Sequence, residues 1–146
     1  MASAQRLNEV AGMRWDEIEG DVWAIPAARH KSKRRHEVPL SATLAALIEA
    51  QPRHDAHVFS VRIGRPAAPG STLKNRIVRE TGVTNWRFND IRRSAATKMA
   101  EGGVSRFIIE RTLGHTETGV TAVYDRHHYR DEKRAALEVL ATATLD

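Results

Sequence analysis

An arginine, a histidine and a tyrosine in the second half of the chain have the types and the spacing to do chemistry together. Arg92 comes first, His115 follows, and Tyr124 lies nine residues after the histidine. A guanidinium neutralises the non-bridging oxygens of a phosphate, and a phenol can attack phosphorus covalently. If the fold gathers these groups in one place, the substrate that suits them best is a phosphodiester.

Three successive helices are expected to carry these residues. Arg92 begins a helix that stops at Gly102-Gly103, and a second helix over 104–113 stops at Gly114. Glycine after a helix is the usual left-handed terminator, so His115 sits at a helix end, where its side chain can point at a ligand. The tyrosine falls on the third of these helices.

The segments IRRSAAT, LGH and YDR, in this order and at these spacings, resemble the tyrosine recombinases of the phage integrase family. The resemblance extends to the front of the chain and covers almost all of it. It implies an integrase-like catalytic domain (the DNA breaking-rejoining fold), mainly α-helical with a small three-stranded antiparallel β-sheet. It also implies that Arg92 and His115 stabilise the phosphate and that Tyr124 is the nucleophile. Tyr129 lies fourteen residues after His115, which does not match the family spacing.

A second arginine stands near the start of the chain. Arg6 and Glu9 are three residues apart, so they share a face on a predicted helix over 3–10. Taken alone, this is an ordinary surface ion pair. The segment QRLNEV followed by GMRWD resembles the first block of the integrases, however. That resemblance implies that Arg6 contacts the scissile phosphate and that Glu9 supports the site from behind.

The first integrase-like block begins almost at residue 1. In the family, at least one helix and a separate DNA-clamping domain come before it. The expectation is therefore that residues 1–146 form a catalytic domain without the N-terminal core-binding domain and without the first helix of the catalytic domain.

A small antiparallel sheet is predicted in the first 40 residues. One short strand ends at Ile18, and two more span 22–25 and 36–38. The stretch between the last two strands, RHKSKRR, is strongly basic. It is either a solvated loop or a hairpin that enters a DNA groove and contacts phosphates.

The basic hairpin also offers a candidate proton donor. Integrases carry a mobile lysine in this hairpin that protonates the departing 5′ oxygen. Lys31 matches it best by position, and Lys33 is a serious rival. Lys33, Arg34 and Arg35 are predicted to contact DNA.

The middle of the chain supplies supporting elements. Ser41 is a predicted N-cap, 64–70 is a predicted loop, and Ser71 is predicted to cap a basic helix. Lys74 and Arg76 on that helix are interpreted mainly as solvated and secondarily as DNA-binding residues that contact phosphates.

The last predicted helix, over 131–140, is amphipathic. Leu137, Val139 and Leu140 supply its apolar side chains. Two interpretations stay open. The helix packs on its own domain, or it docks on a neighbouring subunit, as terminal segments in the family often do.

Asn89 departs from the family pattern. It stands three residues before Arg92, where the family usually has a histidine that helps to deprotonate the tyrosine or binds phosphate. An amide donates a hydrogen bond but cannot take a proton. Asn89 can equally be the N-cap of its helix.

Composition narrows the class of protein. The chain has 146 residues, 23 Lys plus Arg against 18 Asp plus Glu, and a net charge of +5, which favours a polyanionic partner. It has no cysteine, which excludes disulfides and thiolate metal sites. No membrane span or signal peptide is recognisable, so a cytoplasmic, nucleoid-associated place in a bacterium or phage-infected cell is expected.

The resemblance implies site-specific recombination of double-stranded DNA through a 3′-phosphotyrosine, without metal or other cofactor. Other recombinase subunits are the implied partners, in a tetramer on DNA. One alternative is a non-catalytic DNA-binding remnant of a truncated integrase, and another is a helix-turn-helix regulator. A metal hydrolase using His115, His127 and His128 is weaker, because those spacings match no common ligand pattern.

Overall fold

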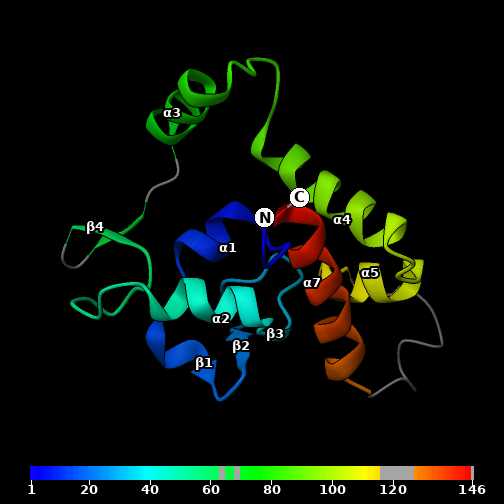
Figure 1. Cartoon of the computed structure of the whole chain (residues 1–146). Coiled ribbons are helices and arrows are strands. Elements are labelled where there is room, and N and C mark those ends of the chain that lie inside the picture. The colour runs from blue at the N-terminus through cyan, green and yellow to red at the C-terminus, as the bar shows by residue number, and fades with distance from the viewer. Residues whose placement is uncertain (63–64, 68–69, 116–126, 146) are drawn as a thin grey trace.

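The computed structural model describes residues 1–62, 65–67, 70–115 and 127–145. The elements, labelled as in Figure 1, are α1 (Leu7–Ala11), the 3₁₀ turn η1 (Trp15–Glu17), β1 (Ile18–Glu19), β2 (Val22–Ile25), β3 (His36–Pro39), α2 (Ala42–Glu49), β4 (Ser60–Arg62), β5 (Arg65–Pro66), α3 (Ser71–Thr81), α4 (Phe88–Glu101), α5 (Arg106–Thr112) and α7 (Arg130–Leu145). The expected fold class, mainly α with a small three-stranded sheet, is confirmed.

The sheet is antiparallel in the order β1-β2-β3. Trp23 occupies its centre, pairing with Ile18 on one side and with Val38 on the other. Every residue of β2 and β3 is buried. Burial on both faces accounts for the unbroken apolar run VWAI of β2, whereas β3 also buries the polar residues His36 and Glu37.

Helix α1 begins later than predicted. Its N-cap is Arg6, and the Glu9 carboxylate accepts a hydrogen bond from the Arg6 backbone N–H at 3.1 Å. A carboxylate at the third helical position satisfies a backbone donor that the helix itself leaves free. The predicted start at residue 3 is wrong, because Ala4 has a φ of 53°. This left-handed conformation is incompatible with a right-handed helix.

Helix α4 begins by the same device. Arg87 is its N-cap, and the Asp90 carboxylate accepts from the Arg87 backbone N–H at 2.8 Å. The alternative that Asn89 is the N-cap is therefore wrong, since it is the second residue of the helix. Arg92 lies in the second turn rather than at the start, with its side chain directed into the fold.

Serine caps are confirmed at one predicted position and corrected at another. The Ser41 hydroxyl accepts from the backbone N–H of Leu44 at 3.2 Å, as predicted for the start of α2. Ser71 is not a cap, because Gly70 holds the extended cap position and Ser71 is already helical. A serine that was not predicted as a cap, Ser105, starts α5 two residues later than expected.

Two further boundaries differ from prediction. The predicted loop over 64–70 includes β5, which pairs with β4 in a short hairpin where Ser60 faces Pro66. Proline is tolerated at such an edge because it needs no ladder partner for an N–H. Helix α7 runs from Arg130 to Leu145, longer at both ends than the predicted 131–140.

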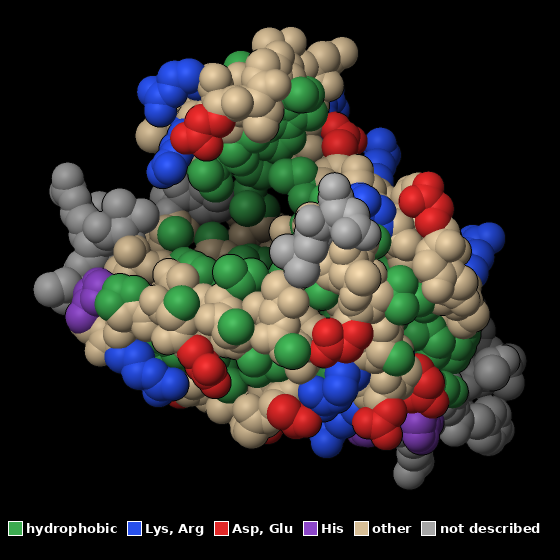
Figure 2. Space-filling view, in the orientation of Figure 1, with side chains coloured by type: hydrophobic (Ala, Val, Ile, Leu, Met, Phe, Trp, Pro, Cys, Tyr) green, Lys and Arg blue, Asp and Glu red, His purple; other side chains and the backbone are tan. Residues whose placement is uncertain are grey.

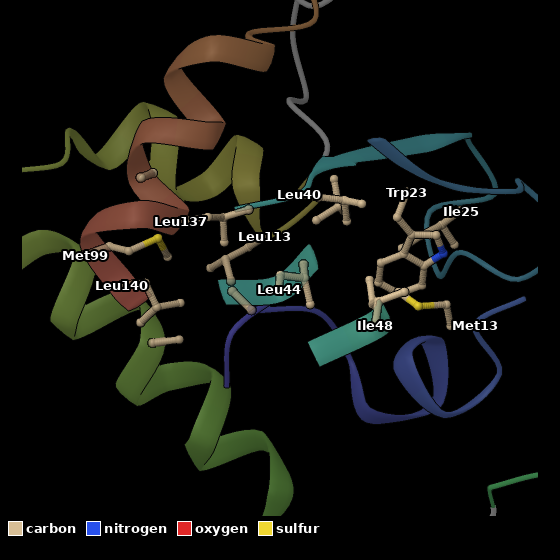
Figure 3. Packing of buried hydrophobic residues seen from close by; sticks show 14 of the residues in the cluster. Met13, Trp23, Ile25, Leu40, Leu44, Ile48, Met99, Leu113, Leu137 and Leu140 are labelled. Atoms are coloured by element: carbon tan, nitrogen blue, oxygen red, sulfur yellow. The ribbon is translucent and has the colours of Figure 1, made fainter. Parts of the chain in front are cut away.

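Helix α7 packs on its own domain. Ala136, Leu137 and Leu140 are completely buried against α4, α5 and the sheet. Figure 3 shows Leu137 and Leu140 beside Met99 of α4, with Trp23 of the sheet at the other end of the same core. Of the two interpretations of this helix, packing on its own domain is the one the fold supports.

Polar contacts fix the same helix along the edge of β3. The Lys133 ammonium is buried and donates to the Glu37 carbonyl at 2.7 Å. Arg130 contacts the Glu37 carboxylate at 2.7 Å, and Arg134 donates to the Leu40 carbonyl at 2.9 Å. The Lys133 and Arg134 contacts satisfy carbonyl groups in and just beyond this edge strand that would otherwise be left to water, and Arg130 adds an ion pair.

Helix α3 stands apart from the other helices (Figure 1). It has no buried residue. The hollow beneath it is lined by hydrophobic side chains (Figure 2) and encloses 310 Å³ between α3, α1, α2 and the start of α4. Leu73 and Ile77 of α3 face this hollow, so the apolar side of α3 is the one turned toward the body.

Candidate active site

A cleft of 490 Å³ opens between the start of α1, the β2–β3 hairpin loop and the start of α4. Five side chains predicted to form the site line it: Arg6, Glu9, Lys31, Asn89 and Arg92. The remaining lining residues are Gln5, Leu7, Asn8, Arg29 and Phe88. The fold therefore gathers side chains from three distant parts of the sequence around one opening.

Glu9 is the buried carboxylate behind this cleft. Its Oε1 lies 3.3 Å from Arg6 Nη1 and 3.7 Å from Nε2 of His30. Only 4% of the Glu9 side chain is exposed, against 29% for Arg6. This carboxylate therefore holds the Arg6 guanidinium from the protein side and leaves part of it open to the cleft.

Arg92 brings a second guanidinium to the cleft and is 8% exposed. Its Nη2 donates to the carbonyl of Leu113 at the end of α5. Its Nη1 is buried and has no hydrogen-bond partner within the described ranges. Burial, followed by the neighbouring charge of Arg6, lowers the Arg92 pKa to about 10. Two cations this close, one of them incompletely paired, make a site that favours an anion.

His115 lies immediately beyond the end of α5. Gly114 has φ of 65°, which confirms the predicted left-handed stop, and His115 is exposed. Partial desolvation, then the charges of Arg92 and Arg6, lower the pKa of His115. The imidazole therefore lies within electrostatic reach of both arginines and is neutral at pH 7.

The basic stretch over 29–35 divides into internal and exposed residues. Arg29 forms two hydrogen bonds with the Glu17 carboxylate at 2.9 and 2.5 Å, and His30 is buried. Arg35 contacts Glu19 at 2.6 Å. The interpretation of the whole stretch as solvated or DNA-facing is therefore wrong for His30, whereas Arg29 is half-buried, paired with Glu17, and still lines the cleft.

Lys31 and Lys33 differ in where they lie. Lys31 lines the cleft beside Arg6 and Arg92. Lys33 is exposed, has φ of 57°, and is absent from the cleft lining, and Arg34 is exposed next to it. This placement favours Lys31 as the cleft cation and leaves Lys33 and Arg34 on the outer surface of the hairpin.

The predicted DNA contacts on α3 already have partners. The Arg76 guanidinium bonds Glu80 at 2.8 Å. The Lys74 ammonium lies 5.6 Å from the ring centroid of Trp86. Both residues are away from the cleft, so their contact with DNA stays a prediction.

Sequence reasoning missed the side chains that hold the end of α5. Gln5 Nε2 donates to the Thr112 carbonyl at 2.8 Å, and His36 Nε2 reaches the same oxygen at 3.3 Å. Together with Arg92 on Leu113, they satisfy carbonyls that a helix end leaves free. In the sequence, Gln5 was only part of a resemblance and His36 only part of a strand, so no local signal paired them with α5.

His36 gives the fold a predicted acid sensitivity. Burial, followed by the charge of Lys133, lowers the His36 pKa to about 3 from an ordinary 6.5. The unfolded chain therefore binds this proton below pH 6.5 while the native chain does not. Below pH 6.5 this group alone lowers the free energy of unfolding of wild type by about 1.4 kcal/mol per pH unit. We therefore expect the free energy of unfolding of His36→Gln to depend less on pH in this range.

Urea unfolding at pH 7 and pH 5 checks this, with His54→Gln, an exposed imidazole, as the control. Between these pH values wild type and His54→Gln should lose roughly 2 kcal/mol more than His36→Gln. Equal losses in all three would contradict a buried neutral His36.

No group of three or more His, Asp or Glu that could hold a metal comes together in the parts of the chain that the structure covers. No helix there is long and apolar enough to cross a membrane. Tyr124 and the third predicted helix lie outside the described residues, so the nucleophile remains a prediction from the sequence.

Comparison with known proteins gives the family of this chain. The model of the phage integrase family matches residues 1–131, nine-tenths of the chain and all of the cleft. The chain belongs to the phage integrase family. This integrase chain is 31% identical to prophage integrase IntA of Escherichia coli, over 91% of the chain and 34% of the relative.

Two further relatives fall in the same range. Prophage integrase IntZ of Escherichia coli is 30% identical over 97% of this chain and 37% of its own length. A XerC-like tyrosine recombinase of Caldanaerobacter subterraneus is 29% identical over 80% of this chain and 29% of its own length. The integrase chain thus spans about a third of the length of the curated relatives it matches.

Proposed function

We propose that this chain is the catalytic part of a site-specific recombinase that cleaves and rejoins double-stranded DNA through a 3′-phosphotyrosine. The observation that carries the proposal is the meeting of Arg6 and Arg92 at one cleft, with Lys31 on its wall and His115 within electrostatic reach. Two guanidinium groups, with Arg92 Nη1 still able to donate a hydrogen bond, suit the two non-bridging oxygens of a phosphodiester. Neither metal nor nucleotide is needed for this chemistry.

In the proposed mechanism, Tyr124 Oη attacks phosphorus and the bond to the 5′ oxygen breaks. Arg6, Arg92 and neutral His115 donate hydrogen bonds to the non-bridging oxygens as charge builds on them. Lys31 gives a proton to the departing 5′ oxygen. Asn89 can donate to the phosphate but cannot accept the phenol proton, so that proton passes to solvent.

The names of the relatives support proposals for the DNA substrate and the partner subunits. Since the relatives are prophage integrases and a tyrosine recombinase, we infer the same class of DNA substrate for this chain. We propose that it acts on chromosomal DNA in the cytoplasm, together with further recombinase subunits in a tetramer. The described cleft corresponds to one active site of that assembly.

A second candidate is a DNA-binding protein without catalytic activity. Asn89 favours it, because the amide replaces a group that can act as a base. The two candidates make the same prediction for DNA binding and opposite predictions for covalent chemistry.

A nicked suicide DNA substrate separates the two candidates. A short oligonucleotide beyond the scissile phosphate diffuses away after cleavage, so a covalent protein–DNA complex accumulates and is seen on a denaturing gel. The substrate set is the sequence flanking the gene in its genome. A covalent complex whose DNA maps to residue 124 by peptide mass spectrometry, and which Tyr124→Phe lacks, supports the recombinase. DNA binding without any covalent complex supports the second candidate.

Binding of duplex DNA should depend strongly on salt, because Lys33 and Arg34 are exposed cations on the hairpin beside the cleft. Each phosphate contact contributes a slope of about −0.9 to log K against log salt concentration. We expect Lys33→Gln to reduce the magnitude of the slope by about 1, as measured by fluorescence anisotropy. Arg76→Gln, whose guanidinium is held by Glu80, should change it less. Binding that is insensitive to salt would contradict the proposed surface.

A further inference from the structure

The His30 imidazole joins three segments behind the cleft. It is 2% exposed, and its ring stacks on His36 with centroids 4.9 Å apart and planes 24° apart. Its Nε2 lies 3.7 Å from the Glu9 carboxylate of α1. Gly114 packs so closely on the ring that a Cβ there would lie 2.7 Å from Nε2. One side chain of the hairpin loop thus contacts α1, β3 and the end of α5.

The same residue closes the turn that contains Lys31. The His30 backbone N–H donates to the Pro26 carbonyl at 3.1 Å, and the Lys33 N–H donates to the His30 carbonyl at 3.0 Å. The His30 Nδ1 lies 2.7 Å from the Ser32 hydroxyl. Lys31 is therefore flanked by two residues whose side chains bond each other.

We propose that His30 is a positioning residue that fixes the hairpin turn so that Lys31 reaches the cleft. His30 itself is absent from the cleft lining, whereas Lys31 lines it with Arg6 and Arg92. A lysine side chain is long and flexible, so only a fixed backbone keeps its ammonium within reach of one atom. This inference rests on the proposed function, in which Lys31 protonates the 5′ oxygen.

The electrostatic surroundings suit this structural task. Burial lowers the pKa of His30, with Glu9 opposing the shift and Arg6 and Arg92 adding to it. The ring is therefore neutral at pH 7. A neutral imidazole can stack on His36 and bond Ser32 without placing another cation beside Lys31.

A pair of suicide substrates tests the proposal: one with the natural 5′ oxygen at the scissile phosphate, and one with sulfur in its place. A thiolate departs without being protonated, so the sulfur substrate makes the proton donor dispensable. The variants are His30→Phe, which keeps a ring of similar size, and the milder Ser32→Ala. Lys31→Ala and Arg92→Met are the reference variants for loss of the donor and loss of phosphate binding.

On the oxygen substrate we expect covalent-complex formation to fall about 100-fold in His30→Phe and about 10-fold in Ser32→Ala. On the sulfur substrate both should return to within about threefold of wild type, as Lys31→Ala does, while Arg92→Met stays impaired. A defect of equal size on both substrates, or no defect on the oxygen substrate, would overturn the proposal.

Amide hydrogen exchange gives a readout that does not depend on catalysis. In His30→Phe the Lys33 amide should exchange at least about tenfold faster, while amides in the centre of α7 keep their wild-type rates. Unchanged exchange at Lys33 would show that His30 does not hold the turn. If wild type forms no covalent complex with either substrate, the proposed function fails, and the exchange measurement alone decides the role of His30.

Discussion

Arg92→Met will reduce formation of the covalent DNA complex by about 100- to 1000-fold and leave the fold intact. The expected loss is that of a preorganised donor to the charge that develops on a phosphate oxygen. The expected stability is within about 1 kcal/mol of wild type, because two effects oppose each other. The variant loses the hydrogen bond to the Leu113 carbonyl, and it also removes a buried cation that lies beside Arg6. Function and stability should therefore separate at this position.

Single-turnover cleavage of the suicide substrate and urea unfolding of the same preparations measure the two effects. Arg93→Met is the matched control, because Arg93 is exposed at the next position of α4 and its guanidinium lies 3.5 Å from the Asp90 carboxylate. The control should cleave within about threefold of wild type. Comparable cleavage rates for Arg92→Met and Arg93→Met would contradict the proposed role of Arg92 in binding the phosphate.

Gly114→Ala will destabilise the protein by about 2–4 kcal/mol. The residue has φ of 65°, where an L side chain costs roughly 1 kcal/mol. Its Cβ would lie 2.7 Å from His30 Nε2 and 3.2 Å from His36 Cδ2, in a part of the fold where both rings are buried. Overpacking a buried position adds about 1–3 kcal/mol.

Gly82→Ala separates the two contributions. Gly82 also follows a helix, has φ of 72°, and would place a Cβ with nothing within 4 Å. We expect it to lose only the conformational share, about 1 kcal/mol. Thermal and urea unfolding of both variants provide the measurement. Equal losses at the two glycines would mean that the end of α5 does not pack tightly on the histidine pair.

The position of His115 should respond to Gly114→Ala as well. The end of α5 is held by Gln5, His36 and Arg92, and His115 follows it directly. Displacing Gly114 from the rings therefore shifts the imidazole relative to Arg92. A variant that refolds at low temperature should still cleave more slowly than wild type.

The sequence by itself determined the residue types of the site and the local elements that carry them. Gly114 as a helix stop, Ser41 as a cap and the three short strands follow from turn chemistry and strand propensity, which act over a few residues. The family-like segments around Arg6, Arg92 and His115, with the nine residues from His115 to Tyr124, assigned these residues to one class of site.

Helix starts were predicted less well where the capping residue was not the one expected from the sequence. The Asp90 carboxylate accepts a hydrogen bond from the Arg87 backbone N–H at the start of α4, and Ser105 is the N-cap of α5. Both helices therefore begin at residues other than the predicted ones. These capping interactions are local. However, several polar residues near each helix start could serve as the cap, and composition does not identify which one does.

Only the tertiary structure decided which basic residues are internal. Arg29 and His30 look like their neighbours Lys31 and Lys33 in the sequence. Yet His30 is buried and Arg29 is half-buried against Glu17, while both lysines are exposed. The partners that separate them, Glu17, Glu9 and Gly114, come from other elements. A partner that lies up to 84 positions away in the chain, as Gly114 does from His30, leaves no periodic or compositional trace near the residue it holds.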